Sequence, residues 1–305
     1  MTATRRKSTS LFSKRTQQAL ALGLRYIPLL ILLFYFTFPL LFMFASAFKS
    51  SNQAIFADLR SWRAFVPVGD VSLDNFIFVF ENSNFLRYIL NSTGLAFITI
   101  LLSLTVNSLA AYALSRLKWP GQRRILAIII ATLIVPGQVT VMPLLLLVAN
   151  LPSISFADGI HITKGWLDTY HVQFVPFVAS AFSIFLFYQF FQEIPKELDE
   201  AAMVDGANRF QIFYKILVPI SGPVFATVSI LTFIGSWNSF LWPIMTVQSD
   251  ELRPVMVGLQ FFFQRNVQWG QVMAYSTMIT IPVLAFFFAF QSAFVKSIAS
   301  TGIKG

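Results

Sequence analysis

The chain has 305 residues, of which 56% are apolar and 11% are charged, and its mean hydropathy is +0.69. A soluble globular domain has roughly 45–50% apolar and about 25% charged residues, so this composition indicates an integral membrane protein. The formal net charge of +9 comes without a patch of interleaved basic and aromatic residues. We therefore attribute it to membrane topology and contact with anionic lipid, and expect no nucleic-acid partner.

The N-terminal segment, residues 1–25, is a basic tail that we expect in the cytoplasm. Arg5-Arg6-Lys7 before the first apolar run and Ala45-Ser46-Ala47 after it resemble a secretory signal with its cleavage site. The apolar core of a cleavable signal has about 7 to 15 residues, and this run is longer. We expect the first helix to be retained, with cleavage as the alternative.

Six runs of the chain contain no charged residue, and each is long enough for a membrane helix, which needs roughly 20 residues. They cover residues 26–48, 88–115, 125–157, 172–192, 216–249 and 266–295. A membrane β-barrel would instead show apolar and polar residues alternating in segments of about 10 residues. The sequence therefore predicts an all-α polytopic protein with six transmembrane helices, in one membrane domain over residues 26–305.

Lys and Arg residues are distributed unevenly between the runs. Fifteen of the 22 lie in the N-terminal tail and in residues 116–124, 196–215 and 296–304. The positive-inside rule places these stretches, and both termini, in the cytoplasm of a multi-pass cell (inner) membrane protein. The outer loops are then residues 49–87, 150–171 and a third loop around 248–268.

Prolines interrupt several runs, at positions 28, 39, 136, 143, 176 and 282. Membrane helices tolerate proline because neighbouring helices and hydroxyl side chains satisfy the freed carbonyl groups, so kinks for packing are the common outcome. The alternative is a broken helix. Pro136-Gly137-Gln138 is the best candidate for such a break, which would open a polar spot near a pathway.

The chain lacks the residues of several function classes. Ionisable groups inside a membrane usually mark proton relays or ion sites, but the six runs contain none, which argues against a proton-coupled carrier. His161 and His171 lie in or beside an outer loop, and there is no cysteine. No hydrolase, zinc-protease or phosphate-loop motif occurs, so we expect no enzyme, metal or cofactor in this chain. Energy for active transport must come from another subunit.

A polar island at about residues 195–217 separates the fourth run from the fifth. Pro195 suits the first position of a short helix, because its missing amide hydrogen is not needed there. Glu197, Asp199 and Glu200 favour the positive end of that helix, and Gly206 suits the left-handed residue that ends it. The island therefore predicts a short helix and a glycine turn.

A second helix is expected to begin near Asn208 and to be broken by Pro219 at the membrane entrance. Its apolar face would be formed by Phe210, Phe213, Tyr214 and Leu217. Spacing alone favours a helix lying on lipid headgroups. A docking element for a partner is the alternative.

The residue order of the island resembles the E-A-A signature of membrane subunits in bacterial ABC importers. The matching residues are Glu200-Ala201-Ala202, Asp205-Gly206-Ala207, Phe213, Ile216, Pro219 and Pro223. Three further stretches resemble the permeases of maltose-type carbohydrate importers: Ile194-Pro195-Lys196-Glu197-Leu198, Ser236-Trp237-Asn238 and the ending Gly302-Ile303-Lys304-Gly305. The resemblance covers nearly the whole chain after the first helix.

The resemblance implies a type I ABC importer permease fold whose signature forms a coupling helix in a cleft of a cytoplasmic ATPase. It implies a second permease subunit, two ATPases that bind ATP and Mg, and an extracytoplasmic solute-binding protein. Glu200 would be the polar anchor in the cleft, Ala201 and Ala202 would permit close approach, and Gly206 would form the turn. Asp205 either caps the second helix or joins a polar contact, and Ala207 completes the coupling set.

Sugars are usually held by aromatic faces together with amide and hydroxyl groups, so we expect Trp237, Asn238, Gln138 and Asn107 along the substrate pathway. Helix packing is the alternative role for each. Carbohydrate is what the family branch implies, and the alternative is the same importer class carrying an amino acid, a polyamine or glycerol phosphate. The charge-free runs offer no Arg or Lys for a phosphate ester. A passive channel or secondary carrier would transport without nucleotide.

Overall fold

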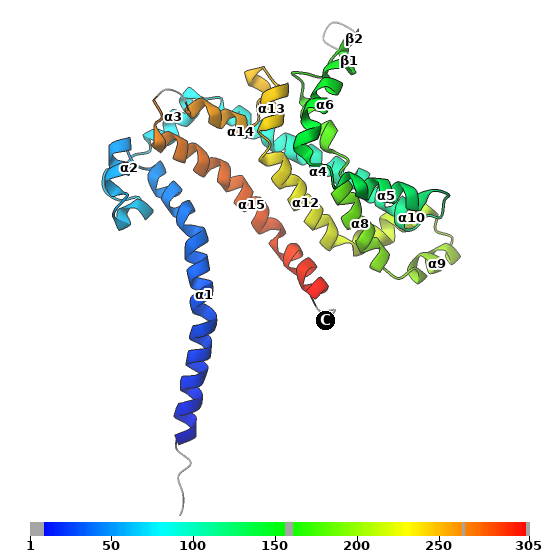
Figure 1. Cartoon of the computed structure of the whole chain (residues 1–305), viewed down its shortest axis with the longest axis horizontal. Coiled ribbons are helices and arrows are strands. Elements are labelled where there is room, and N and C mark those ends of the chain that lie inside the picture. The colour runs from blue at the N-terminus through cyan, green and yellow to red at the C-terminus, as the bar shows by residue number, and fades with distance from the viewer. Residues whose placement is uncertain (1–8, 156–160, 264–265, 303–305) are drawn as a thin grey trace, which may run out of the picture. The chain divides into compact units, whose positions relative to one another are not determined.

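The computed structural model describes residues 9–155, 161–263 and 266–302. The first eight residues of the basic tail and the last three of the Gly302–Gly305 motif lie outside this range. The chain divides into two compact units, coloured along the sequence in Figure 1. Unit 1 contains the chain up to Val79 together with Asn266–Thr277, and unit 2 contains Phe80–Arg265 and the chain from Met278 onward.

Unit 1 is built on the first membrane helix and the outer segment that follows it. Its elements are α1 (Thr9–Ala47), α2 (Asn52–Asp58), η1 (Trp62–Phe65), most of α3 (Asp74–Asn82) and the start of α15 (Trp269–Gly302). Lys49 is buried where α1 ends, and its Nζ donates to Asp58 Oδ2 at 2.6 Å and to the carbonyl of Val68 at 2.6 Å. This buried ion pair fixes the outer segment, because an unpaired buried ammonium would be costly.

Unit 2 contains the remaining elements. They are α4 (Phe85–Ser115), α5 (Gln122–Thr132), α6 (Gly137–Asn150), β1 (Pro152–Ser155), β2 (His161–Lys164), α7 (Tyr170–Phe174), η2 (Val175–Phe177), α8 (Ala181–Glu193), α9 (Glu197–Val204), α10 (Arg209–Ile212), the π-helical turn η3 (Phe213–Leu217), α11 (Val218–Ile220), α12 (Gly222–Trp237), α13 (Leu241–Thr246), η4 (Asp250–Leu252), α14 (Val255–Gly258), η5 (Leu259–Phe262) and the rest of α15.

The fold is all-α and polytopic, as the charge-free runs predict. Three described helices are long and apolar enough to cross a membrane: Leu22–Ala47 within α1, Phe85–Ser115 and Trp269–Gln291 within α15. Three further spans are bent pairs: α5 with α6 at 103°, α7 and η2 with α8 at 43°, and the α10 to α11 segment with α12 at 80°. Six spans result when each bent pair counts as one.

Pro136 marks a break rather than a kink. Helix α5 ends at Thr132, and Pro136 takes an extended conformation as the N-cap of α6. Proline disfavours the helical region for the residue before it, which favours the end of α5 ahead of Val135. By contrast, Pro28 and Pro39 lie inside the continuous helix α1, where packing kinks were expected.

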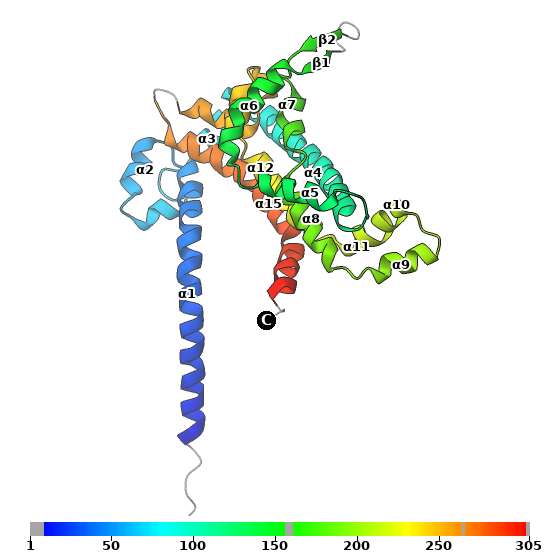
Figure 2. The ribbon, with the colours of Figure 1, turned by 45° about the vertical axis from the view of Figure 1, so that its right-hand side comes forward.

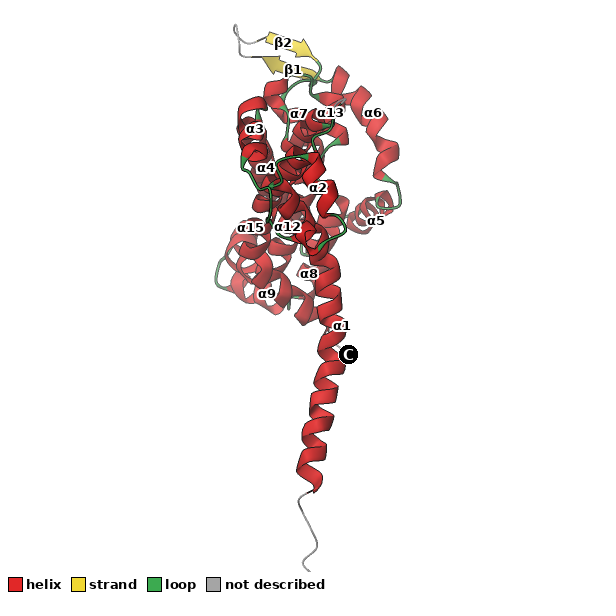
Figure 3. Ribbon diagram, turned by 90° about the vertical axis from the view of Figure 1, so that its left-hand side faces the viewer, coloured by secondary structure: helices red, strands yellow, loops and turns green. Residues whose placement is uncertain are grey.

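The outer loop at residues 150–171 contains a hairpin that the sequence did not predict. Strands β1 and β2 pair antiparallel, with Pro152 opposite Lys164, and are the yellow arrows of Figure 3. Within unit 2 the hairpin lies at the end opposite α9 and α10 (Figures 1 and 2). The charge count predicts that the loop and the polar island lie on opposite sides of the membrane.

The core of unit 2 lies between α4, α8 and α12, and the π-helical turn packs against it. Buried apolar residues of these elements include Ala111, Phe187, Phe191, Leu217 and Val228. The ring of Phe187 meets that of Phe225 edge to face, with 4.8 Å between centroids. Inside a membrane such contacts stabilise through close packing, because lipid tails are as apolar as the side chains. The core forms the frame on which the polar island is mounted.

Candidate coupling helices and transport cavity

Helix α9 begins later than the sequence suggested. Its first residue is Glu197 and its N-cap is Lys196, whose carbonyl accepts from Asp199 N at 3.0 Å and Glu200 N at 3.1 Å. Pro195 stands before the cap, so its expected place as the first helical residue is wrong. Ile194, which precedes the proline, is extended and ends α8. The two residues Ile194 and Pro195 thus form the corner between α8 and α9.

Gly206 ends α9 in the left-handed region, with φ of +83°, as the sequence predicted. Its N–H donates to the carbonyl of Met203 at 3.1 Å, and Ala207 N donates to that of Ala202 at 2.9 Å. This pair of bonds is the Schellman arrangement, which satisfies the last carbonyls of a helix. The turn is therefore defined by hydrogen bonds as well as by the glycine.

Asn208 caps the second helix. Its side chain accepts from Gln211 N at 2.8 Å, and the Gln211 side chain accepts from Asn208 N at 2.8 Å, which completes a capping box. The capping role considered for Asp205 is therefore wrong. Asp205 is the C-cap of α9 and is exposed, so a polar contact with a partner stays as its expected role.

The apolar face of the second helix differs from the expected one. Ile212, Phe213 and Leu217 are buried, whereas Phe210 and Tyr214 are 64% and 49% exposed. The π-helical turn at Phe213–Leu217 adds a residue to the turn and so rotates the face away from a regular helical stripe.

Pro219 does not break the helix, which is a second departure from the sequence analysis. The chain continues through Pro219 in α11 and bends at Ser221, the residue between α11 and α12. The bend therefore lies two residues beyond the expected break.

The signature residues are divided between the surface and the interior. Glu200, Ala201, Asp205 and Gly206 are exposed, and Ala207 is half-buried. Ala202 is buried against this chain, so it is not available for close approach by a partner. Around Glu200 the surface of α9 also exposes apolar side chains, of which Val204 is 88% exposed.

An ion pair that the sequence analysis missed holds α9. Arg116, just after α4, places Nη1 3.2 Å from Asp199 Oδ2, and the two side chains are 2% and 10% exposed. Its Nη2 donates to the carbonyls of Phe191 at 2.5 Å and Ile194 at 2.7 Å. Arg116 and Asp199 are 83 residues apart, and no local pattern in the sequence indicates their pairing.

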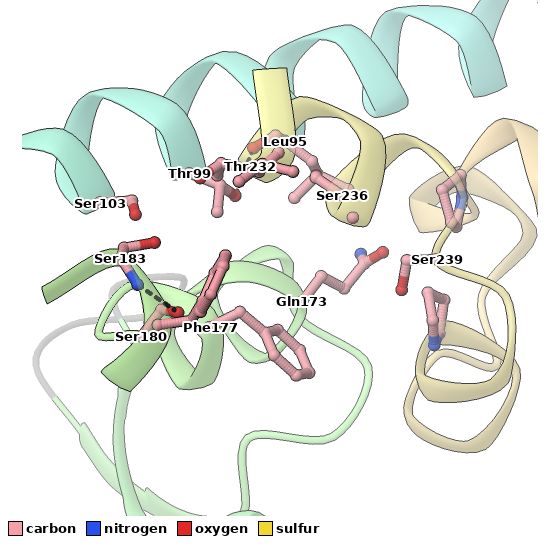
Figure 4. Close-up of a pocket in the computed structure, with 15 residues that line it drawn as sticks. Leu95, Thr99, Ser103, Gln173, Phe177, Ser180, Ser183, Thr232, Ser236 and Ser239 are labelled. Atoms are coloured by element: carbon pink, nitrogen blue, oxygen red, sulfur yellow. Dashed lines mark hydrogen bonds between the residues drawn. The ribbon is translucent and has the colours of Figure 1, made fainter. Parts of the chain in front are cut away.

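A cavity of about 340 Å³ lies in unit 2 between α4, the α7–α8 bend and α12 (Figure 4). Its polar lining consists of hydroxyl and amide side chains: Thr99, Ser103, Gln173, Ser180, Ser183, Thr232, Ser236 and Ser239. Phe177 and Phe182 supply aromatic surface, and none of the described residues that line the cavity is charged. Pockets for small ligands generally have about 300–1,000 Å³.

Gln173 presents a free acceptor to this cavity. Its Nε2 donates to the carbonyl of Leu252 at 3.0 Å, which fixes the amide, while the buried Oε1 finds no hydrogen-bond partner among the described residues. In Figure 4 the amide points toward Ser236 and Ser239. A buried acceptor without a partner costs roughly 1–3 kcal/mol, so a ligand hydroxyl at this point would remove a penalty.

The four residues expected along the pathway lie outside the cavity lining. Asn107 and Trp237 are buried at 0% and 2% exposure, and Trp237 stacks on Phe233. Asn238 and Gln138 are exposed and do not belong to the lining of the cavity. A signal for the cavity was present in the sequence, because its hydroxyl residues recur at helical spacing on two runs: Thr99 and Ser103 on α4, and Thr232 and Ser236 on α12.

In unit 2, Asp168 ties two loops together. It accepts from Ser249 N at 2.8 Å and Gln248 N at 3.0 Å, as well as from the Ser249 hydroxyl. The hydrogen bonds from Ser249 hold the pKa of Asp168 below its ordinary value. A lowered pKa means that this stabilisation is present at neutral pH and is lost as pH falls through the lowered pKa.

Residues 103–300, which include the polar island and most of the cavity lining, match the family described as "Binding-protein-dependent transport system inner membrane component". The chain belongs to this family. It is a membrane-spanning permease subunit of an ABC importer, and such a subunit is not itself an enzyme.

Two relatives of this permease cover nearly its whole length. It is 28% identical over 274 residues to an arabinooligosaccharides transport system permease protein of Halalkalibacterium halodurans, covering 89% of this chain and 92% of the relative. It is 29% identical over 285 residues to an sn-glycerol-3-phosphate transport system permease protein of Yersinia pestis, covering 90% and 95%.

Solved structures show the same fold. A chain of a bacterial ABC transporter involved in the import of the acidic polysaccharide alginate has a TM-score of 0.72 at 23% identity, covering 96% of this permease and 100% of that chain. A bacterial alginate ABC transporter in complex with an alginate pentasaccharide-bound periplasmic protein gives 0.61 at 15% identity, covering 92% and 95%.

Proposed function

We propose that this permease forms, with a second permease subunit, the pathway by which a sugar or oligosaccharide enters the cell. An extracytoplasmic solute-binding protein delivers the sugar, and two cytoplasmic ATPases bind ATP and Mg and drive the cycle. The observation that carries the solute class is the uncharged cavity with Gln173 and its hydroxyl groups. In this arrangement both termini and the α9–α10 segment face the cytoplasm.

The cavity suits a polyhydroxylated solute in three respects. Serine and threonine hydroxyls both donate and accept, as sugar hydroxyls do. Gln173 Oε1 is a fixed acceptor without a partner among the described residues. Phe177 offers an aromatic ring beside these groups. The name of the arabinooligosaccharide relative supports the same solute class.

A phosphate ester is the second candidate, because a relative is named for sn-glycerol-3-phosphate. A buried phosphate needs a cation or a dense set of donors, since an unpaired charge is expensive to bury. The lining described for the cavity contains neither Lys nor Arg. The cavity therefore favours a neutral solute.

For the coupling site we propose that α9 enters a cleft of the ATPase, with Glu200 as the polar anchor. Ala201 permits close approach, Gly206 and Ala207 form the turn, and Asp205 makes a polar contact. The exposure of Glu200, Ala201 and Val204 on one short helix supports this role. ATP then shifts the population between two arrangements of the membrane helices, which gives alternating access to the cavity.

Replacing Gln173 with leucine tests the solute class. We expect Gln173→Leu to raise the sugar concentration for half-maximal uptake by about 2- to 12-fold, because one hydrogen bond to a neutral group is worth about 0.5–1.5 kcal/mol. The measurement is ATP-driven uptake of radiolabelled arabinooligosaccharide, maltose, lactose and sn-glycerol-3-phosphate into vesicles holding the complete complex. Gln138→Leu, which changes an exposed glutamine outside the cavity, is the matched control. Uptake of the phosphate ester alone would overturn the sugar assignment.

A further inference from the structure

The guanidinium of Arg116 joins three separate parts of unit 2. Nη1 contacts Asp199 on α9, while Nη2 contacts the carbonyls of Phe191, in the last turn of α8, and Ile194, which ends it. These carbonyls lie at the end of α8, where regular helical hydrogen bonds run out, although the carbonyl of Phe191 also accepts from Ile194 N at 3.4 Å. One side chain thus holds the end of α4, the end of α8 and α9 together.

Helix α9 has little else to hold it. Of its eight residues only Asp199 and Ala202 are buried. Ala202 contributes one methyl group, which can slide over a neighbour at little cost. The charged contact of Asp199 is therefore the directional attachment between α9 and the membrane helices.

The second helix of the polar island is attached to the same turn of α4. Tyr112 lies four residues before Arg116, so both side chains lie on one face of that helix. The Tyr112 hydroxyl donates to the carbonyl of Arg209 at 2.9 Å, and its ring meets that of Phe213 with 5.2 Å between centroids. Tyr112 thus holds α10 as Arg116 holds α9.

We infer that Arg116 and Tyr112 are positioning residues that fasten both coupling helices to the last turn of α4, so that movement of α9 reaches α4 and α8 as one body. This inference rests on the proposed coupling role of α9. Arg116 is the stronger attachment, because it makes charge-assisted bonds to two elements at once. Thr99 and Ser103 of the cavity lie on α4, and Arg116 is the C-cap of that helix, which gives a rigid path from Arg116 to the solute site.

The burial of the pair explains why it would transmit movement. An exposed ion pair is loosened by water and salt, whereas a buried pair with carbonyl partners keeps one geometry. Arg116 Nε and Asp199 Oδ1 are also buried and find no partner among the described residues. Removing either side chain would therefore leave the other as an unpaired buried charge.

The absence of cysteine from this chain permits a test that needs no knowledge of the solute. Ser236→Cys places a single thiol of this chain in the cavity. In vesicles with the complete complex, this thiol is reacted with a membrane-impermeant maleimide, in the presence and in the absence of ATP and vanadate. Peptide mass spectrometry measures the labelling of this chain over time. We expect the two labelling rates to differ when Arg116 is present. Arg116→Ala should reduce the ratio of the faster labelling rate to the slower one by about 2- to 30-fold, which is the range for residues along a coupling network.

Matched variants distinguish the positioning role of Arg116 from general effects of surface charge and of impaired folding. Lys118→Ala and Glu197→Gln change exposed charges beside Arg116 and Asp199 and should leave the ratio unchanged. Tyr112→Phe removes only a hydroxyl and should reduce the ratio less than Arg116→Ala does. If Arg116→Ala fails to assemble with the ATPases, Asp199→Asn decides, because it removes the charge and keeps the shape.

The outcomes distinguish this inference from the proposed function. An unchanged ratio in assembled Arg116→Ala or Asp199→Asn complexes would overturn the positioning role while leaving α9 as the coupling helix. Equal labelling rates with and without nucleotide in the Ser236→Cys complex that retains Arg116 would overturn the coupling proposal, and this inference with it. A reduced ratio with normal recovery of the ATPases supports both.

Discussion

Gly206→Pro is expected to abolish ATP-driven uptake while the permease still inserts into the membrane. The φ angle of Gly206 is +83°, and the ring of proline fixes φ near −65°, so the turn between α9 and α10 cannot form. Proline also removes the N–H that bonds to the carbonyl of Met203. We expect no ATP-driven uptake into vesicles, since a rigid coupling element is lost rather than one contact. Membrane insertion is checked by the yield of detergent-extracted permease.

Two glycine variants serve as controls. Gly206→Ala meets no atom within 4 Å of its added Cβ, so its cost is only the left-handed backbone, about 1–2 kcal/mol. It should reduce uptake far less than the proline. Gly222→Ala, which also has open space and lies outside the left-handed region, should leave uptake unchanged. Full uptake by Gly206→Pro would show that the α9 turn takes no part in coupling.

The features that the sequence predicted correctly depend on residues close together in the chain. Charge-free runs predict membrane helices because each run must satisfy its own backbone in lipid. Gly206 predicts a left-handed turn because the steric reason lies in that residue alone. The start of the second helix near Asn208 was also predicted from residues close together in the chain, although the reciprocal hydrogen bonds of Asn208 with Gln211 were seen only in the structure.

The features that the sequence analysis missed depend on residues far apart in the chain or on a local change from α-helical to π-helical geometry. Arg116 and Asp199 meet only after the elements between them, from α5 to α8, have folded. The π-helical turn at Phe213–Leu217 rotates the apolar face and lets the helix pass through Pro219, which a regular periodicity does not predict. Helical spacing of the hydroxyl residues that line the cavity was visible in the sequence, whereas Asn107 and Trp237, which were expected along the pathway, lie outside the described lining.

Asn107→Leu is expected to destabilise the permease rather than to change its solute affinity. The Asn107 amide donates to the carbonyl of Val178 at 2.9 Å and to the carbonyl and hydroxyl of Ser103 at 2.7 Å, and its oxygen accepts from Ser180 N at 2.9 Å. Val178 and Ser180 lie at the bend before α8, and Asn107 bonds there to the carbonyl of Val178 and to the N–H of Ser180. Leucine fills similar space but leaves two backbone groups unpaired, at a cost of about 2–4 kcal/mol. The measurement is the midpoint of thermal aggregation in detergent.

Asn238→Leu is the matched control, because Asn238 is exposed and should change stability by less than about 0.5 kcal/mol. The two roles considered for Asn107 give opposite results. If Asn107 fastens the bend, Asn107→Leu lowers the thermal midpoint and leaves the solute concentration for half-maximal uptake unchanged in the surviving complex. If Asn107 contacts solute, Asn107→Leu raises that concentration at an unchanged midpoint, and this result would return Asn107 to the pathway. Full burial of the amide, with all its described partners inside the chain, favours the first result.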